Sequence, residues 1–420
     1  MDASLSVPAS LMDDAGRRRY AMWWIVALAL AARLAAVLVF GFGHPGTSND
    51  AGAYHDIAAN LVTRHEYVTN ADPPHRLDLP NATRPPLTPW LLAAVYLVTG
   101  PNWRAGQLAM VFLGAAGCVM IALLGRKLFG DPVGLVAGTL SAVYPFFVFV
   151  SSMPLTENLA VVLYVAVVIL ILNFLERQRM VDALGAGVVL GLAALNKPTI
   201  LAAVPLLGGW LLLTSRGGPR TAFPLTLVLL AGTLATLLPW TVRNYLVLGA
   251  VFPVTTQAGA ALYMANGFHA DFPISRLEDG ATGWYDRPGS GIDVEGLSPV
   301  EADRIRSAAA WRFIREHPAK FLEQSGRKMR VFWGAYPHFL HRASWRVVAL
   351  LSLAGVYLTR RSWHRLMPVY LLIAQTALVH ALFTALPRYR MSIEPFLLVF
   401  AAYALVWLAA RFSLARPSPV

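Results

Sequence analysis

The sequence contains very little cysteine and little charge. Its single cysteine, Cys118, lies inside an apolar run, which excludes a disulfide within the chain and a metal site built from cysteines. Only 14% of the 420 residues are charged, whereas 56% are hydrophobic. This balance is typical of a polytopic membrane protein and fits a soluble domain poorly.

Glycine loops that bind phosphate are also missing. There is no Gly-x-x-x-x-Gly-Lys loop and no strand followed by a dinucleotide-type glycine loop. The net charge of +12 could suggest a nucleic-acid partner. The basic residues, however, mostly follow the positive-inside rule of membrane proteins. We therefore expect membrane lipids as partners and no nucleic acid.

A membrane-spanning helix needs roughly 20 apolar residues. The sequence predicts spans over 21–42, 106–125, 132–150, 157–175, 183–196, 198–214, 222–240, 345–359, 366–386 and 392–410. The first follows Arg17-Arg18-Arg19 and is too long for a signal-peptide core, so it indicates an uncleaved anchor. A further apolar run, 87–100, is ambiguous.

The charges of the short loops decide how 87–100 is placed. If it does not cross, the loops on one side carry Arg17 to Arg19, Arg126, Lys127, Arg177, Arg179, Arg216, Arg220, Arg360, Arg361, Arg365, Arg411 and Arg416. The short loops on the other side hold only Lys197, Arg388 and Arg390. If it did cross, this bias would reverse. The positive-inside rule favours about ten crossings with both termini cytoplasmic and with 87–100 resting in the outer leaflet.

Two long segments, 43–105 and 241–344, then face outward. We expect a membrane module over 1–240, an external helical segment over 241–344 and further spans over 345–420. In the external segment, Ser298-Pro299-Val300-Glu301 predicts a helix start with a capping box, and His317-Pro318 predicts a break before a second helix that ends near Trp333.

The second external helix is amphipathic. Its polar face carries Lys320, Arg327, Lys328 and Arg330. That face is either solvated and in contact with lipid headgroups, or a landing site for an anionic lipid or polymer.

Two acids, Asp50 and Glu157, are predicted where the membrane meets the outer water phase. Nucleotide-activated sugars stay inside the cell, so a transferase working there would need a donor held in the membrane, such as a sugar on polyprenyl phosphate. Its phosphate leaving group needs cations, and attack by an acceptor hydroxyl needs one carboxylate base. We choose Asp50 as that base. Each acid could also simply cap or begin a helix.

Four arginines are candidates for the donor phosphate: Arg84, Arg243, Arg388 and Arg390. The last two are the best signal, because positive charge in an outer loop opposes the topology bias. Arg33 lies within the first span and needs a partner, either an ion pair or a phosphate. His380 is expected to be a packed, hydrogen-bonded histidine rather than a ligand.

A metal site is not indicated by the spacing of these residues. The outer segments offer Asp50, His55, Asp56, His65 and Asp72, which could hold a hard divalent ion through oxygen ligands. Their spacing is not diagnostic, so we expect no required cofactor or metal.

Six motifs in order resemble the GT-C superfamily of membrane glycosyltransferases, in its bacterial branch akin to dolichyl-phosphate-mannose protein mannosyltransferases and the lipid A aminoarabinose transferase. In chain order, the six motifs are Asp50-Ala51-Gly52-Ala53-Tyr54, Arg84-Pro85-Pro86, Pro154-Leu155-Thr156-Glu157, Leu195-Asn196-Lys197-Pro198, Leu238-Pro239-Trp240-Thr241-Val242-Arg243-Asn244-Tyr245 and Arg388-Tyr389-Arg390-Met391. The fifth motif is the most specific and continues to Asn266. Two departures are Ala51, where many relatives have glutamate, and Lys197, where arginine is usual.

The resemblance implies an all-helical, GT-C-like fold and an inverting transferase of the hexosyl or pentosyl class. It implies that Asp50 is the catalytic base, that Glu157 supports the acceptor site or an ion, and that Arg84 and the late arginines grip the donor phosphate. Residues expected to bind substrate are Tyr54, Lys197, Asn244 and Tyr389. The acceptor would be a glycan, lipid or protein outside the bacterial cytoplasmic membrane.

Two other functions remain open. A flippase or transporter of lipid-linked glycans would explain the many spans and Arg33, but it needs polar residues through both leaflets, and the polar residues gather on one side. A polymerase or ligase that uses polyprenyl-diphosphate glycans shares the outward site, so only the identity of the donor distinguishes it.

Overall fold

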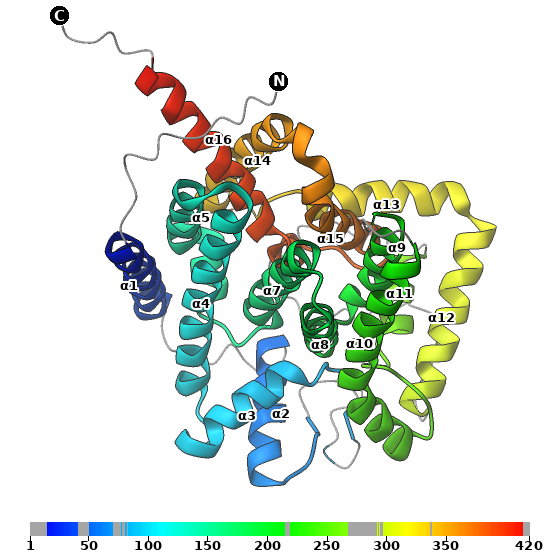
Figure 1. Cartoon of the computed structure of the whole chain (residues 1–420). Helices are drawn as coiled ribbons and strands as arrows, with labels where there is room; N and C mark the ends of the chain where they lie inside the picture. The colour runs from blue at the N-terminus through cyan, green and yellow to red at the C-terminus, as the bar shows by residue number, and fades with distance from the viewer. Residues whose placement is uncertain are drawn as a thin grey trace, which may run out of the picture.

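The computed structural model describes residues 15–40, 50–69, 80–81, 83–214, 219–267, 297–336 and 338–414, with the single positions 77, 292 and 294. Helices are the regular elements of this part of the chain (Figure 1). The first half contains α1 (Ala15–Phe40), α2 (Asp50–Thr63), α3 (Leu87–Thr99), α4 (Trp103–Phe129), α5 (Asp131–Val143), α6 (Pro145–Val150), α7 (Thr156–Arg177) and α8 (Met180–Asn196). The second half contains η2 (Pro198–Ala202), α9 (Ala203–Thr214), α10 (Pro219–Leu248), α11 (Ala258–Ala265), α12 (Pro299–Glu316), α13 (Pro318–Phe332), α14 (Phe339–Leu358), η5 (Arg360–Ser362), α15 (Trp363–Leu382), η6 (Pro387–Ser392) and α16 (Glu394–Leu414).

Six of the described helical segments are long and apolar enough to cross a membrane: Tyr20–Val39, Trp103–Phe129, Thr156–Arg177, Ala222–Leu248, Arg360–Leu382 and Glu394–Phe412. The shorter apolar helices are Leu87–Thr99, Asp131–Val143, Met180–Asn196 and Pro198–Leu213. These ten segments include nine of the predicted spans, 132–150 only in part. The tenth prediction, 345–359, falls on α14, which lies in neither group. With 13 residues, α3 rises only about 20 Å, so it is too short to cross alone.

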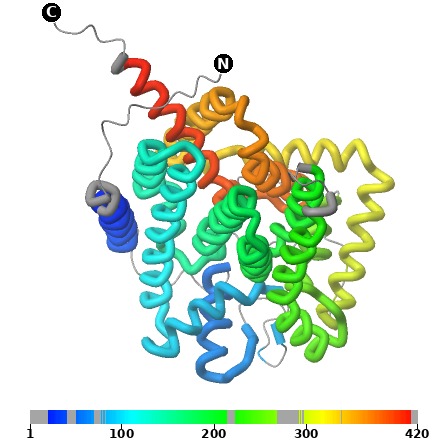
Figure 2. Tube along the Cα trace, viewed as in Figure 1, coloured from blue at the N-terminus to red at the C-terminus, as the bar shows by residue number. Residues whose placement is uncertain are grey.

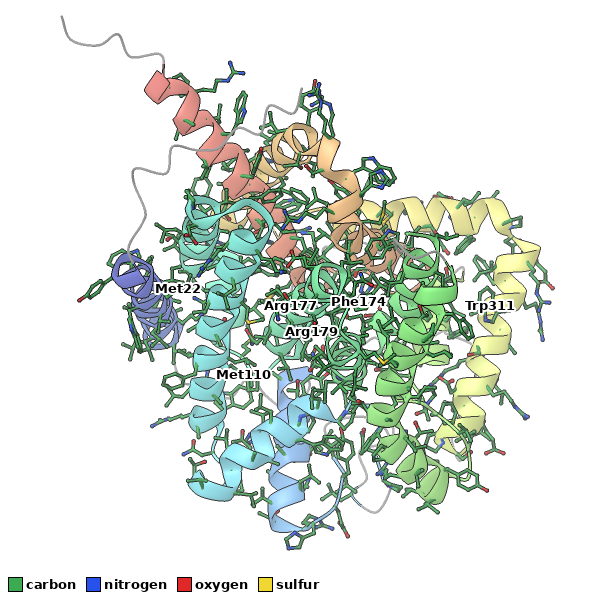
Figure 3. All side chains as sticks on the ribbon, viewed as in Figure 1. Met22, Met110, Phe174, Arg177, Arg179 and Trp311 are labelled. Atoms are coloured by element: carbon green, nitrogen blue, oxygen red, sulfur yellow. The ribbon has the colours of Figure 1, made fainter. Side chains whose placement is uncertain are left out.

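The centre of the molecule is α7, which packs between α4 and α8, while α10 packs on the other side of α8 (Figures 1 and 2). Phe174 of α7 is buried in this core, whereas Trp311 of α12 is exposed at the periphery (Figure 3). Close packing depends on glycine at several crossings. At Gly355 of α14, an added Cβ would lie 2.1 Å from the carbonyl oxygen of Phe400 on α16, so only glycine fits there.

The loops that the sequence placed on one side do meet in space. Lys127 lies in the last turn of α4, Glu176 in the last turn of α7 and Arg365 in the first turn of α15. Both basic side chains pair with Glu176, at 2.6 and 3.5 Å. Glu157 is in the first turn of the same α7, so 19 positions separate the two acids, or about 28 Å of helix. That length is close to the hydrocarbon thickness of a bilayer. The two ends of α7 are therefore far enough apart to lie at opposite faces of a bilayer.

The span predicted over 132–150 is broken into α5 and α6 at Tyr144-Pro145. Proline has no N–H, so the carbonyl of Ser141 loses its usual partner in the helix, and the turn at Tyr144 leaves Ala142 without one. Arg33 of α1 supplies donors instead. Its guanidinium group donates to the carbonyl of Ala142 at 3.1 Å and lies 3.5 Å from that of Ser141.

The remaining contacts of Arg33 are also neutral. It donates to Ala29 O, Cys118 Sγ and Ser151 Oγ at 3.2 Å each. Within the described residues, no carboxylate pairs with it. The expectation of an ion pair is therefore wrong for the described residues, because helix carbonyls freed by the Pro145 break provide the buried acceptors. The alternative of a phosphate contact stays a prediction.

Replacing Arg33 with methionine should destabilise the fold, since the carbonyls at the end of α5 would lose their donors. Each buried polar group left unpaired costs about 1–3 kcal/mol. We expect a clear fall in the detergent-solubilised protein's thermal midpoint, measured by tryptophan fluorescence. Arg64→Met is the matched control, because Arg64 pairs with Glu66 at the surface. A midpoint for Arg33→Met as high as that of the control would contradict this role.

The external helices begin and end as predicted. Ser298 and Glu301 form the capping box of α12, and α13 starts at Pro318. The polar face of α13 needs one correction. Lys328 points inward, where its Nζ donates to the carbonyls of Ala265 and Leu382, the last residues of α11 and α15. Burial lowers the pKa of Lys328 to about 8. This lysine thus ties helix ends together instead of facing lipid headgroups.

Candidate active site

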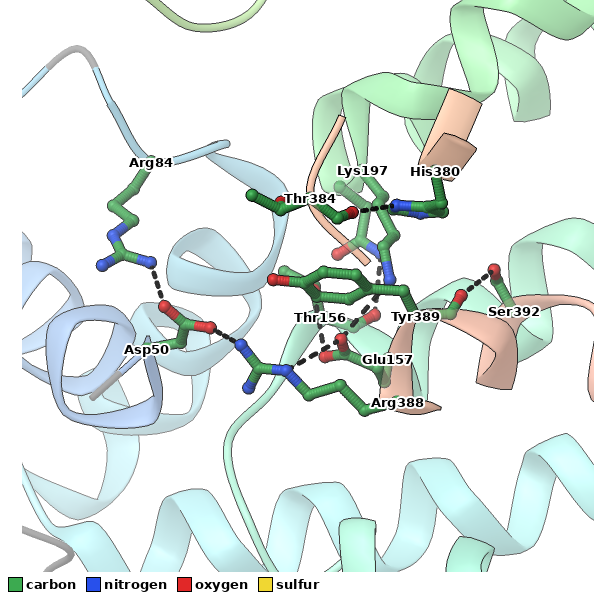
Figure 4. A network of polar contacts seen from close by, with 11 residues as sticks. Asp50, Arg84, Thr156, Glu157, Lys197, His380, Thr384, Arg388, Tyr389 and Ser392 are labelled. Atoms are coloured by element: carbon green, nitrogen blue, oxygen red, sulfur yellow. Dashed lines mark hydrogen bonds and ion pairs between the residues drawn. The ribbon is translucent and has the colours of Figure 1, made fainter. Parts of the chain in front are cut away.

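Asp50, the first residue of α2, lies between two guanidinium groups from distant parts of the chain (Figure 4). Arg84 donates to Oδ1 at 2.6 Å, and Arg388 of η6 donates to Oδ2. The Asp50 side chain is 30% exposed, whereas that of Glu157 is 3% exposed. Of the two predicted acids, Asp50 is therefore the one that a substrate can reach.

The backbone before α3 fixes the position of Arg84. The Asn81 side chain accepts hydrogen bonds from the backbone N–H groups of Thr83 and Arg84, at 3.1 and 2.9 Å, which is an Asx turn. Tyr67 Oη donates to the carbonyl of Arg84 at 3.1 Å. The guanidinium group also lies over the ring of Tyr54, 5.6 Å from its centroid. The predicted substrate residue Tyr54 thus packs beneath Arg84.

Arg243 and Asn244 lie behind this loop. Arg243 donates to the carbonyl of Asn81 at 3.1 Å and covers the ring of Trp240. Asn244 is buried, and its amide donates to the carbonyls of Phe252 and Val254. Arg243 thus braces the backbone that carries Arg84, and Asn244 holds Arg243 by accepting a hydrogen bond from it at 3.2 Å. In the described structure neither residue pairs with Asp50. Asn81 was missed in the sequence, although an asparagine just before a required turn is a recognisable signal.

Glu157 forms a second, closed pair beside the first. It lies in the first turn of α7, so the expectation that this acid begins a helix fits the structure. Lys197, just after α8, places Nζ 3.4 Å from Glu157 Oε1, and Arg388 Nε lies 4.0 Å from the same oxygen. Arg388 therefore bridges the two acids, and Lys197 belongs to the cluster through Glu157.

An aromatic column supports these cations. Tyr389 lies under Lys197 Nζ at 5.0 Å and beside the Arg388 guanidinium group. His380 stacks on Tyr389, with ring centroids 4.9 Å apart. His380 Nδ1 lies 2.8 Å from the carbonyl oxygen of Thr384, so this nitrogen must carry the proton. The expectation that His380 is a packed, hydrogen-bonded histidine fits this geometry.

Arg390 is not part of the cluster. It is fully buried, pairs with Glu394 at 2.7 Å and donates to the carbonyls of Phe332 and Gly334. Its guanidinium carbon lies 3.5 Å from the ring centroid of Trp345. This arginine joins η6 to the end of α13 and to α16, and its geometry gives it no route to the phosphate role that we expected.

The charges of the cluster act on one another. Burial alone would raise the pKa of the Asp50 carboxyl, but the guanidinium groups of Arg388 and Arg84 outweigh it and hold that pKa well below its ordinary value. The same pairing holds the pKa of Arg388 above its ordinary value against burial. The three cations Arg84, Lys197 and Arg388 face two anions, so the formal net charge is +1.

Three of the residues considered as metal ligands, Asp50, His55 and Asp56, have other partners. Asp56 accepts from Thr69, and His55 Nδ1 lies 2.7 Å from the hydroxyl of Tyr96. The described residues include no group of three His, Cys, Asp or Glu side chains that could hold a metal ion. Asp72 lies outside the described residues.

Residues 83–242 match the family model described as dolichyl-phosphate-mannose-protein mannosyltransferase. No curated protein sequence matches the chain. The oligosaccharyltransferase of Archaeoglobus fulgidus, tethered to an acceptor peptide, has a TM-score of 0.57 and 16% identity over 94% of this chain and 50% of that chain. The chain has the GT-C fold.

A second archaeal structure supports the same fold. The oligosaccharyltransferase AglB from Archaeoglobus fulgidus, in complex with an inhibitory peptide and a dolichol-phosphate, gives a TM-score of 0.54 at 16% identity over 95% of this chain and 53% of that chain. ArnT from Cupriavidus metallidurans, bound to undecaprenyl phosphate, gives only 0.40 at 16% identity over 91% and 77%, which is too low to establish a shared fold. The chain spans about half the length of the oligosaccharyltransferase.

The GT-C fold predicted from the six motifs is confirmed. The match over residues 83–242 contains Arg84, Glu157 and Lys197 but neither Asp50 nor Arg388. The tertiary structure brings these two residues, which were chosen from the sequence, next to Arg84 and Glu157.

Proposed function

We propose that the protein is an inverting glycosyltransferase that moves a sugar from polyprenyl phosphate to an acceptor hydroxyl at the outer face of the bacterial cytoplasmic membrane. One observation carries the proposal: Asp50 is a partly exposed carboxylate held between Arg84 and Arg388. This is the set of one base and several phosphate-binding cations that the reaction needs.

In the proposed reaction, Asp50 takes the proton of the acceptor hydroxyl. The oxygen attacks the anomeric carbon from the side opposite the phosphate, so a single displacement inverts that centre. The bond from the anomeric carbon to the phosphate oxygen breaks, and its electron pair stays on the phosphate. Arg84 and Arg388 stabilise the charge that develops there. Lys197 and Glu157 keep Arg388 in place.

A lipid-linked donor is supported by the matched family description, which names dolichyl-phosphate-mannose, and by the dolichol-phosphate in an AglB complex of similar fold. The net charge of +1 also suits a donor phosphodiester, which carries one negative charge. A diphosphate donor would leave more charge unbalanced, which counts against the polymerase or ligase alternative.

The outward orientation is supported by the charged ends of α7. Glu157 and the catalytic cluster lie at its first turn, and the basic residues Lys127 and Arg365 gather near its last turn. Arg177 ends α7 and Arg179 precedes α8, and both are exposed. Since basic loops stay in the cytoplasm, the cluster faces outside.

The purified protein in proteoliposomes tests the proposal. With polyprenyl-phosphate sugar and a bacterial envelope extract as acceptor, we expect mass spectrometry to detect a new glycosidic product together with free polyprenyl phosphate. Chelation with EDTA should leave the rate within about twofold, because no metal is assigned a role. Translocation of donor without a new glycosidic bond would favour a flippase. Consumption of only diphosphate-linked donors would favour a polymerase or ligase.

A further inference from the structure

In this structure the proposed base, Asp50, forms ion pairs with the two arginines that are proposed to bind the donor phosphate. Arg84 donates a hydrogen bond to Oδ1 of Asp50, and Arg388 donates one to Oδ2. A carboxylate whose charge is held by two guanidinium groups is a weak base. Equally, an arginine engaged with Asp50 is not available to a phosphate. Some exchange of partners must precede the reaction.

Of the two ion pairs made by the arginines of η6, only the pair with Asp50 is exposed to solvent. The side chains of Asp50, Arg388 and Arg84 are 30%, 22% and 10% exposed. The pair of Arg390 with Glu394 is 0% exposed on both sides. An incoming anion can therefore compete for the arginines of Asp50, while the buried pair is closed to it.

The two arginines are held independently of Asp50. The backbone of Arg84 is fixed by Asn81 and Tyr67, and its side chain packs on Tyr54. The Nε atom of Arg388 lies 4.0 Å from Glu157 Oε1, and this contact can persist when the terminal nitrogen of Arg388 leaves Asp50. Both guanidinium groups would thus remain as a preformed site for an anion after the carboxylate withdraws.

We propose that Asp50 stands in for the donor phosphate in the unoccupied protein, and that the donor must take Arg84 and Arg388 from Asp50 before Asp50 can act as a base. This inference rests on the proposed function and adds to it the order in which the two substrates bind. The donor binds first and, by taking the cations, makes Asp50 basic enough for the acceptor.

The exchange also accounts for the proton. During transfer the acceptor oxygen bonds to the anomeric carbon, the bond to phosphate breaks, and the hydroxyl proton moves to Asp50. When polyprenyl phosphate leaves, the arginines return to Asp50. Their charges favour the ionised carboxylate, so the proton passes to solvent and the site is reset.

Removal of the Asp50 charge should therefore strengthen binding of the lipid phosphate. We expect Asp50→Asn to bind undecaprenyl phosphate about tenfold more tightly than wild type or better, because the arginines no longer have an internal partner. The dissociation constant would be measured at neutral pH on the full chain in detergent, by native mass spectrometry. Asp50→Ser, which also removes the charge, gives a second measurement should asparagine disturb folding.

Two controls separate competition from a general charge effect. Glu66→Gln removes an exposed carboxylate that pairs with Arg64, and it should leave the dissociation constant within about twofold. Adding Arg84→Gln to Asp50→Asn should abolish the gain, since one of the two released cations is gone.

Unchanged or weaker binding by both Asp50 variants would overturn the exchange. If those variants also lose transfer, the proposed function survives without it, with Asp50 orienting the arginines. Tighter binding together with wild-type transfer would support competition at the phosphate site and remove Asp50 as the base. The two failures are thus distinguishable.

Discussion

Asp50→Asn is expected to lower the turnover number of sugar transfer by about 10³-fold, within the range usual for loss of a general base. Asparagine has nearly the shape of aspartate but cannot accept the hydroxyl proton. The loss should appear at saturating donor, because the variant still binds lipid phosphate. The measurement is the initial rate of product formation in proteoliposomes, with expression and thermal midpoint checked beside it.

The control for this variant is Glu66→Gln, which changes an acid in a surface pair and should transfer at the wild-type rate. A rate for Asp50→Asn within about tenfold of wild type would remove Asp50 as the base. Glu157 would not be an easy substitute, since its side chain is 3% exposed and paired with Lys197.

Arg388→Gln should lower transfer by about 10²- to 10³-fold, the usual effect of losing one group that stabilises developing charge. Arg388 contacts Asp50 and lies 4.0 Å from Glu157, so its loss also leaves two acids with fewer cations. Arg388→Lys retains the charge without the planar guanidinium group, so its transfer rate should lie between those of the wild type and Arg388→Gln. Initial rates at several donor concentrations would separate binding from turnover.

Arg388→Gln should also change how kcat/KM depends on pH. Arg388 and Arg84 hold the pKa of Asp50 below its ordinary value of 3.8, so ionised Asp50 persists in the donor-free protein to unusually low pH. Without Arg388, the pKa rises, and the acid limb of the pH profile of kcat/KM should move to higher pH.

Arg390→Gln is a matched comparison two positions away. Its buried pair with Glu394 would be broken, so the main effect should be a fall in thermal midpoint. An Arg388→Gln protein with full activity, or an Arg390→Gln protein that is stable but inactive, would show that the roles of the two arginines are reversed.

Distant segments build the site. Asp50 and Arg388 are 338 positions apart in the chain, yet they share an ion pair. Arg84 and Lys197 enter from two further elements, the turn before α3 and the end of α8. Each supplies a side chain at the end of a helix, where short polar connections leave room for chemistry while the helices form the apolar scaffold.

Much of the architecture was determined by the sequence itself. Apolar runs of helical length, the capping box at Ser298 and the break at His317-Pro318 are local signals, and most of them gave the predicted helices. The run 132–150 is the exception, because it is broken at Tyr144-Pro145. The charge bias of the short loops correctly grouped Lys127 and Arg365 at one end of the bundle. The choice of Asp50 and Arg84 as site residues also came from the sequence, by motif order, and their roles stay predictions. The division into segments 1–240, 241–344 and 345–420 stays a prediction as well.

The choice of partners was decided only by the tertiary structure. Arg388 and Arg390 look equivalent in sequence, but two positions on a 3-10 helix differ by about 240° in direction, so one reaches Asp50 and the other is buried against Glu394. Arg33 found helix carbonyls in place of an acid because Pro145 had released them. Periodicity and composition report a residue's own element, whereas an ion pair depends on which elements pack together, and that is settled only when the whole bundle forms.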